Sequence, residues 1–128
     1  MTIESPGKTV PMTVKKLLIA NRGEIAIRIL RAAADLGIPS VAIYAEDEAQ
    51  SLHVAKADEA AALPGRGVPA YLDGAAILDL AREMNCDAIH PGYGFLSENA
   101  EFALACAQAG IAFVGPGAET LEVFGDKA

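Results

Sequence analysis

Apolar runs alternate with amphipathic segments along most of this 128-residue chain. Short apolar or alanine-rich runs indicate strands, because strands of a parallel sheet are buried on both faces. Such runs lie at residues 15–20, 41–44, 59–63, 88–89 and 111–114. Segments with helical periodicity lie at 24–36, 72–85, 100–110 and 118–124, and residues 51–57 are expected to form one or two helical turns. Residues 64–69, rich in Pro and Gly, are expected to form a loop.

Strands that alternate with helices predict an α/β fold, a mostly parallel five-stranded sheet with helices on both faces. Right-handed crossovers favour the strand order 3-2-1-4-5, numbered along the chain. In this order the loops at residues 21–23 and 91–96 flank the point where the strand order reverses, where α/β sheets bind ligands. Residues 1–13 are polar and contain two prolines. We expect them to form a disordered tail before a domain at 14–128.

The acidic balance of the chain argues against some classes of partner. Its net charge of −7 disfavours nucleic acid and anionic membrane surfaces, so neither is an expected partner. Cys86 and Cys106 form no CxxC motif and are expected to be buried free thiols in a reducing, cytoplasmic compartment. His53 and His90 have no other ligand at metal-binding spacing. We therefore expect no metal site, and each His should make a positioning hydrogen bond.

The loop after the fourth strand, at residues 90–99, reads HPGYGFLSEN. Gly92 and Gly94 allow positive φ and close approach of the backbone to a ligand. Ser97 is expected to cap the following helix and to leave N–H groups free, with Glu98 in its first turn. A Pro-Gly turn followed by an ordinary cap has the same pattern. The residues alone leave both interpretations open.

The first helix has an unusually wide apolar arc for a surface helix. Its charged residues form one narrow stripe. The apolar residues expected to face the sheet are Ile25, Ile29, Ala32, Ala33 and Leu36. The stripe is either solvated, with ion pairs Glu24–Arg28 and Arg31–Asp35, or covered by another domain or subunit. We favour the covered helix because one sheet face cannot bury the whole arc.

The first strand–helix turn, Asn21-Arg22-Gly23, lacks the GxGxxG pattern of dinucleotide-binding proteins, and the chain has no Walker A sequence. Glu46 and Asp47 lie at a spacing that suits a ribose contact. Without the glycines, however, this spacing does not predict NAD binding.

Three motifs occur in a fixed order: IANRGEIA at 19–26, HPGYGFLSEN at 90–99 and GDK at 125–127. Together they closely resemble the amino-terminal domain of biotin carboxylases, and the resemblance covers residues 15–128. It implies the Rossmann-like, pre-ATP-grasp domain of an ATP-grasp ligase. The implied reaction carboxylates carrier-bound biotin with bicarbonate and ATP through carboxyphosphate.

The resemblance also implies roles for individual residues. Lys127 matches the family lysine that contacts ATP phosphate. Tyr93 and Gly94 match the loop that lines the biotin pocket, and His90 and Glu98 lie in the same loop with supporting roles. The residues that match the family's dimer helix are Arg28, Arg31 and Asp35.

The implied cofactors are ATP and Mg²⁺, and biotin is the carried substrate. The implied partners are the remaining ATP-grasp domains, a biotin carrier domain and a second subunit in a homodimer. The family's metal-binding and catalytic residues follow the matched region, so we expect no catalytic residue here and no activity from this chain alone. The alternative is a stand-alone Rossmann-like binding or scaffold module without catalysis. The final acyl-CoA or keto-acid acceptor is not predicted.

Overall fold

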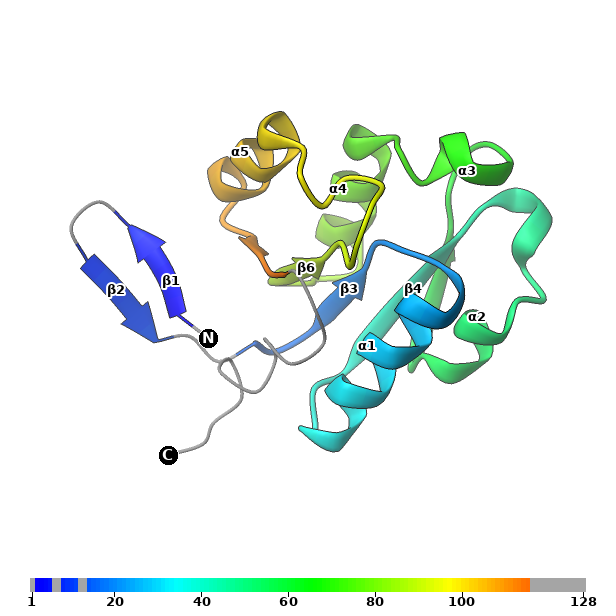
Figure 1. The fold of residues 1–128 in the computed structure, drawn as a ribbon, viewed down its shortest axis with the longest axis horizontal. Helices are drawn as coiled ribbons and strands as arrows, with labels where there is room; N and C mark the ends of the chain where they lie inside the picture. Colours follow the sequence, from blue (N-terminus) through cyan, green and yellow to red (C-terminus); the bar gives the residue numbers. More distant parts are fainter. Residues whose placement is uncertain (1, 6–7, 12–13, 116–128) are drawn as a thin grey trace.

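The computed structural model describes residues 2–5, 8–11 and 14–115. Five parallel strands form one sheet in the order β5-β4-β3-β6-β7 (Figure 1). This is the predicted order 3-2-1-4-5, and the predicted α/β fold is confirmed. The strands are β3 (Leu17–Ile19), β4 (Ser40–Tyr44), β5 (Glu59–Ala62), β6 (Ala88–His90) and β7 (Ala112–Phe113).

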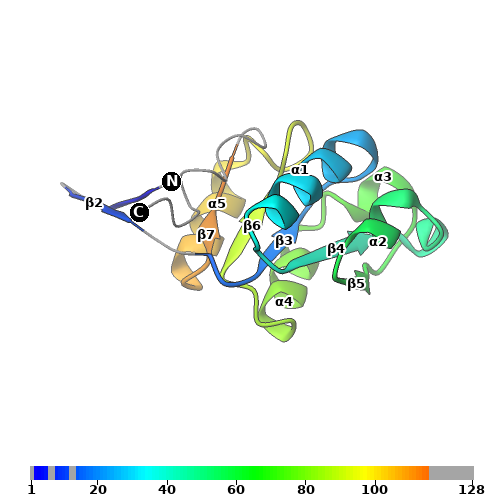
Figure 2. The ribbon, with the colours of Figure 1, turned by 90° about the horizontal axis from the view of Figure 1, so that it is seen from below.

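Helices cover both faces of this sheet, as Figure 2 shows for α1 on one side and α4 on the other. The helical elements are α1 (Gly23–Asp35), the 3-10 turn η1 (Glu46–Glu48), α2 (Leu52–Lys56), α3 (Gly67–Ala70), α4 (Gly74–Glu83) and α5 (Ala100–Gln108). Leu18 and Ile89 point to the side of α4 and α5, whereas Leu17 and Ile19 point to the side of α1. All four are fully buried, which explains why β3 is apolar throughout, whereas the edge strand β5 begins with Glu59 and is largely exposed.

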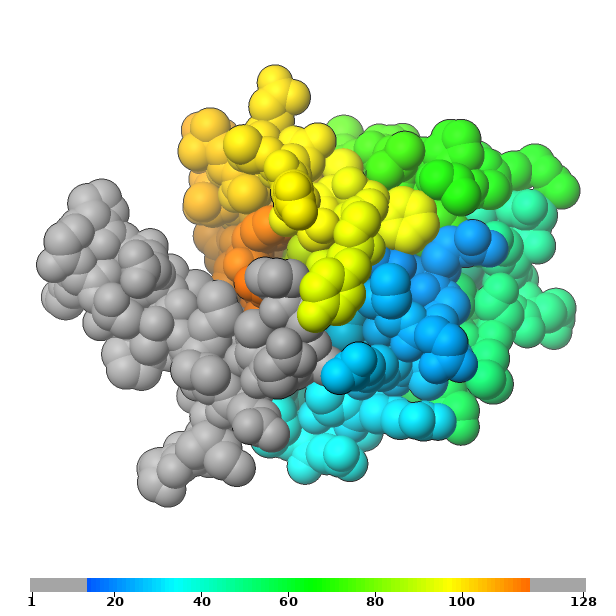
Figure 3. Space-filling model, viewed as in Figure 1, coloured from blue at the N-terminus to red at the C-terminus, as the bar shows by residue number. Residues whose placement is uncertain are grey.

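The parallel register brings the carboxyl ends of β3 and β6 together. Ile19 is paired with His90, and the Ala20 N–H donates to the His90 carbonyl oxygen at 2.9 Å. The β3–α1 turn (residues 20–22) therefore lies beside the loop that follows β6. We call residues 91–99 the site loop. In the space-filling view its yellow atoms lie against the blue atoms of the turn and of α1 (Figure 3).

The structure has local features that the sequence analysis did not predict. Residues 2–5 and 8–11, within the stretch expected to form a tail, form an antiparallel pair, β1 (Thr2–Ser5) and β2 (Lys8–Pro11). These segments contain β-branched residues with Pro6-Gly7 between them in the sequence, which favours a hairpin. The expected loop at 64–69 contains most of α3, which tolerates Pro69 because N–H groups of a first turn need no helical partner. The helix expected at 118–124 lies outside the described residues.

The sheet-facing side of α1 also differs from the prediction. Ile25, Ala32 and Leu36 are only half-buried, whereas Ala26 and Leu30, which are not in the predicted sheet-facing set, are fully buried. Helix α2 packs beside α1, so another element of the same chain covers part of the wide apolar arc. The arc therefore does not require an outside partner over its whole width.

Candidate functional site

Asn21 connects the β3–α1 turn to the site loop. Its side chain is 1% exposed, and its amide nitrogen donates to the carbonyl oxygens of Pro91 at 2.7 Å and Tyr93 at 2.8 Å. Its amide oxygen accepts the Arg22 N–H at 2.8 Å. Both amide protons and the amide oxygen are therefore used, which fixes two carbonyl groups of the loop in direction.

The backbone of the site loop lies in the left-handed region at several positions. Gly92 and Gly94 have φ of 70°, as their residue type predicted, and Phe95 has φ of 46° although it carries a side chain. Among the described residues, the N–H groups of Tyr93 and Gly94 have no hydrogen-bond acceptor. Successive N–H groups in such a conformation form a concave donor site for a carbonyl or an anion.

The ring of Tyr93 is 49% exposed and faces an open pocket against α1. The pocket has a volume of about 240 Å³ and is lined by Glu24, Ile25, Arg28, Ile29 and Tyr93. The structure thus brings together a predicted biotin-loop residue and a predicted interface residue, Arg28. No pattern in the sequence indicated that these two residues line one pocket, because they are far apart along the chain.

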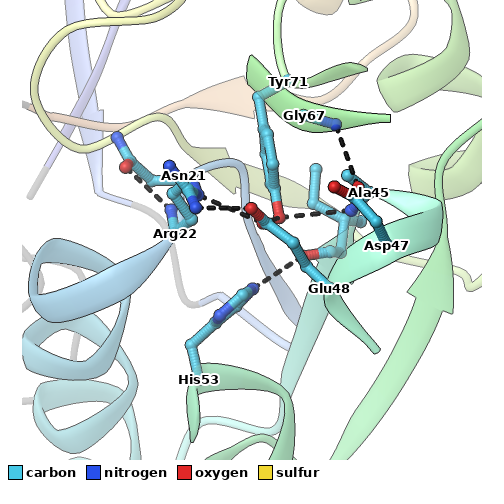
Figure 4. A network of polar contacts seen from close by, with 9 residues as sticks. Asn21, Arg22, Ala45, Asp47, Glu48, His53, Gly67 and Tyr71 are labelled. Atoms are coloured by element: carbon cyan, nitrogen blue, oxygen red, sulfur yellow. Dashed lines mark hydrogen bonds and ion pairs between the residues drawn. The ribbon is translucent and has the colours of Figure 1, made fainter. Parts of the chain in front are cut away.

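A polar network that the sequence analysis missed lies at the carboxyl ends of β3 and β4 (Figure 4). The Arg22 guanidinium forms a two-point ion pair with Glu48, with Nε to Oε1 at 3.1 Å. The same Oε1 accepts the Tyr71 hydroxyl proton at 2.6 Å, and the Tyr71 oxygen accepts the Ala45 N–H at 3.2 Å. The sequence did contain a signal for this network, because Arg22 follows the first predicted strand and the oppositely charged Glu48 follows the second.

Tyr71 joins this network to the site loop. Its fully buried ring lies 5.6 Å from the ring of Phe95, and the Arg22 guanidinium lies 5.8 Å from the Tyr71 ring centroid. Burial is the main cause that raises the pKa of Tyr71 to about 12, and the hydrogen bond to Glu48 is the second. The phenol is therefore neutral near pH 7 and acts as a hydrogen-bond donor.

Of the two acidic residues considered for a ribose, Glu46 and Asp47, the side chain of Asp47 has a structural partner. Asp47 accepts the Gly67 N–H at 3.0 Å, and this bond is the main reason that its pKa lies below the usual value. Together with the Arg22–Glu48 pair, this contact positions η1 and α3 at the carboxyl edge. The acidic run therefore supports the fold.

The cap predicted for the helix after the site loop was wrong. Asn99, not Ser97, is the N-cap of α5, because its side chain accepts the Phe102 N–H at 2.8 Å. The Ser97 N–H donates to the Gly94 carbonyl oxygen at 2.8 Å and closes a turn. Glu98 is exposed and precedes the helix, so it does not lie in the first helical turn.

The two histidines make the positioning hydrogen bonds that were expected. His90 is fully buried, and its Nδ1 accepts the Gly92 N–H at 3.0 Å, a contact that holds the start of the site loop. His53 is also buried, with Nε2 at 2.9 Å from the Ile43 carbonyl oxygen. Cys86 and Cys106 are buried and free, as predicted.

The charged stripe of α1 is exposed, including Arg28, Arg31 and Asp35. Within the described part of the chain, neither Glu24–Arg28 nor Arg31–Asp35 forms an ion pair, so the pairs named for the solvated alternative are not present there. Long exposed side chains gain little by pairing in water, which explains why these charges have no ion-pair partner among the described residues. Lys127 lies outside the described residues.

The described residues contain no group of three or more His, Cys, Asp or Glu side chains placed to hold a metal ion. Their helices are also too short or too polar to cross a membrane.

Comparisons with known proteins place this geometry in a family. The model of the "Biotin carboxylase, N-terminal domain" matches residues 13–121. Pyruvate carboxylase of Staphylococcus aureus is 58% identical over 116 residues, which cover 89% of this chain and 10% of that protein. The chain thus spans about a tenth of the length of this relative.

Solved structures agree with this match. A biotin carboxylase domain of a single-chain bacterial carboxylase is 65% identical, with a TM-score of 0.77, over 88% of this chain and 26% of that chain. The Hydrogenobacter thermophilus 2-oxoglutarate carboxylase domain is 50% identical, with a TM-score of 0.79, over 91% of this chain and 26% of that chain. That structure is a dimer in complex with MgADP, ADP and bicarbonate. Sequence and fold agree, and the chain belongs to the family of biotin carboxylase amino-terminal domains.

Proposed function

We propose that this chain is the amino-terminal domain of a longer biotin-dependent carboxylase and supplies one wall of its biotin site. The observation that carries the proposal is the site loop, which presents the exposed Tyr93 ring beside N–H groups of Tyr93 and Gly94 that have no acceptor among the described residues. A flat ring and adjacent backbone donors suit the bicyclic ring and the ureido oxygen of biotin.

The reaction proposed for the complete protein is the ATP-dependent carboxylation of carrier-bound biotin by bicarbonate. Support comes from the related 2-oxoglutarate carboxylase domain, whose structure contains MgADP and bicarbonate. We propose that Lys127 contributes a phosphate contact and that other domains hold Mg²⁺ and the reacting groups. Within this chain, Asn21 and His90 orient the loop, and the Tyr93 ring excludes water from one side of biotin. Water exclusion matters because carboxyphosphate hydrolyses readily.

The proposed partners are the other ATP-grasp domains, a biotin carrier domain and a second copy that meets the α1 stripe. The dimeric 2-oxoglutarate carboxylase domain and the exposed Arg28, Arg31 and Asp35 support the homodimer. A cytoplasmic location is proposed from the free buried thiols. Relatives named for pyruvate and for 2-oxoglutarate match this domain comparably, so it does not indicate the final acceptor.

The test uses the full-length protein that carries this chain. Phosphate release from MgATP should require bicarbonate and rise with added biotin, and Tyr93→Ala should raise the KM for biotin about tenfold, the loss expected for one ring contact. Leu104→Ala is the matched control, because Leu104 is also exposed (59%) but lies on α5. Absence of biotin-dependent phosphate release in the wild type would refute the proposal and favour a scaffold module.

A further inference from the structure

The site loop has a conformation that its own residues do not favour. Phe95 has φ of 46°, a region in which the side chain of an L-residue crowds the following carbonyl group, at a cost of about 1–2 kcal/mol. The loop also leaves N–H groups of Tyr93 and Gly94 without an acceptor among the described residues. Something outside the loop must hold this arrangement.

One contact comes from Asn21. Its amide group donates to Pro91 and Tyr93, on the two sides of Gly92, and its side chain is buried. An added Cβ at Gly92 would lie 2.8 Å from the Asn21 amide nitrogen, so the two residues are packed without spare room. Because the carbonyl of Tyr93 belongs to the same peptide plane as the N–H of Gly94, fixing the carbonyl fixes the direction of that N–H.

The second contact comes from Tyr71. Its ring packs against the Phe95 ring at 5.6 Å between centroids. Tyr71 is itself held by hydrogen bonds to Glu48 and Ala45 and by the Arg22 guanidinium over its ring. Arg22 directly follows Asn21, so a single turn holds the loop directly through Asn21 and supports it through Tyr71 (Figure 4).

We propose that Asn21 and Tyr71 are positioning residues that preorganise the site loop, so that the N–H of Gly94 and the ring of Tyr93 are directed toward biotin. This inference rests on the proposed function, because it assigns the loop to biotin. Neither residue touches the substrate in this scheme. Their effect reaches biotin through the direction of the Tyr93–Gly94 peptide and through the backbone of Phe95.

The test compares two kinetic constants in the full-length protein. Asn21→Ala and Tyr71→Ala should each raise the KM for biotin about tenfold and change the KM for ATP less than twofold, because only the loop is displaced. Tyr71→Phe keeps the ring against Phe95, so its KM for biotin should be close to the wild-type value. Ile38→Ala is the destabilising control, since Ile38 is buried in the cluster beneath α1. It should leave the ratio of the two KM values at the wild-type value.

Hydrogen exchange of the peptide that spans residues 91–96 provides a readout that needs no activity. Exchange in this peptide should accelerate in Asn21→Ala and Tyr71→Ala but not in Ile38→Ala, at a pH where all variants remain folded. Unchanged loop exchange, or equal increases in both KM values, would overturn the proposal. If the wild type lacks biotin-dependent turnover, the proposed function fails and the substrate assignment falls with it. Loop exchange then decides whether Asn21 and Tyr71 hold the loop.

Discussion

Polar side chains bind the backbone at both edges of the sheet, but the Asn21 amide at the carboxyl edge binds the opposite groups from two carboxylates at the amino edge. At the amino edge, the Asp87 carboxylate accepts the N–H groups of Lys15 and Lys16 at 3.0 Å. Asp58 accepts the Ser40 N–H at 2.9 Å in the same way. At the carboxyl edge, the Asn21 amide donates to two loop carbonyl oxygens instead.

The difference determines which groups remain for a ligand. Carboxylates at the amino edge satisfy the N–H groups at which strands begin, so that edge is closed by its own side chains. The donor at the carboxyl edge satisfies carbonyl groups and leaves the N–H groups of Tyr93 and Gly94 without a partner among the described residues. Unpaired backbone donors are costly if buried but useful if a substrate supplies the acceptor. The leftover donors therefore favour a binding loop over an ordinary Pro-Gly turn.

The largest expected effect comes from a side chain at Gly92. An added Cβ would lie 2.7 Å from Ile25 Cγ2 and 2.8 Å from the Asn21 amide nitrogen, at φ of 70°. Gly92→Ala should lower the free energy of unfolding by about 2–5 kcal/mol. Gly94→Ala is the matched control, because Gly94 has the same φ but nothing within 4 Å of the added Cβ. It should cost only about 1–2 kcal/mol.

Urea unfolding followed by circular dichroism measures both variants. Equal losses at the two glycines would mean that the backbone conformation alone sets the cost. The close packing of Gly92 against Asn21 would then add nothing to the free energy of unfolding, and it would not constrain the loop.

The next effect tests the amino edge. Asp87→Ala removes a charged acceptor of two N–H groups and should cost about 1.5–3 kcal/mol of unfolding free energy. Asp79→Ala is the control. Asp79 is exposed, and its ion pair with Arg82, at 3.8 Å, is weak and worth less than about 1 kcal/mol. In the full-length protein, Asp87→Ala should leave the biotin KM unchanged. A rise in KM as large as that of Asn21→Ala would show that the two edges do not have separate roles.

The last effect concerns pH. Burial and then the Glu48 hydrogen bond raise the pKa of Tyr71 from 10.0 to about 12, so the folded protein holds this proton more tightly than the unfolded chain. Its contribution to stability is complete below pH 10 and is lost as the pH rises toward 12. Tyr71→Phe should therefore show a flatter fall of unfolding free energy over that interval, measured by urea titration at each pH.

The buried thiols do not confuse this comparison. Burial raises the pKa of Cys86 and of Cys106 from 9.0 to about 11, so both also lose their contribution as the pH rises. They are present in wild type and variant alike, and their effect cancels in the difference. Identical slopes above pH 10 would show that the Tyr71 hydroxyl contributes no proton-linked stability at the carboxyl edge.

The sequence determined the order of the elements, the strand order and the place of the loop at 90–99. Apolar runs buried on both faces identify parallel strands from local pattern alone, and the handedness of crossovers then restricts their order. The positive φ of Gly92 and Gly94 also followed from residue type. These features are local or depend on general chirality, so a single chain is enough to predict them.

Only the tertiary structure decided how the carboxyl edge is assembled. Arg22, Glu48 and Tyr71 come from three separate segments, and their pairing depends on which strand ends become neighbours. Asn99 and Ser97 both have side chains that can cap a helix, and the structure shows that Asn99 is the N-cap of α5. The covered side of α1 likewise depended on the docking of α2. Hydrogen bonds between residues far apart along the chain, and the burial of their side chains, depend on how the whole sheet packs. A local residue pattern therefore does not predict them.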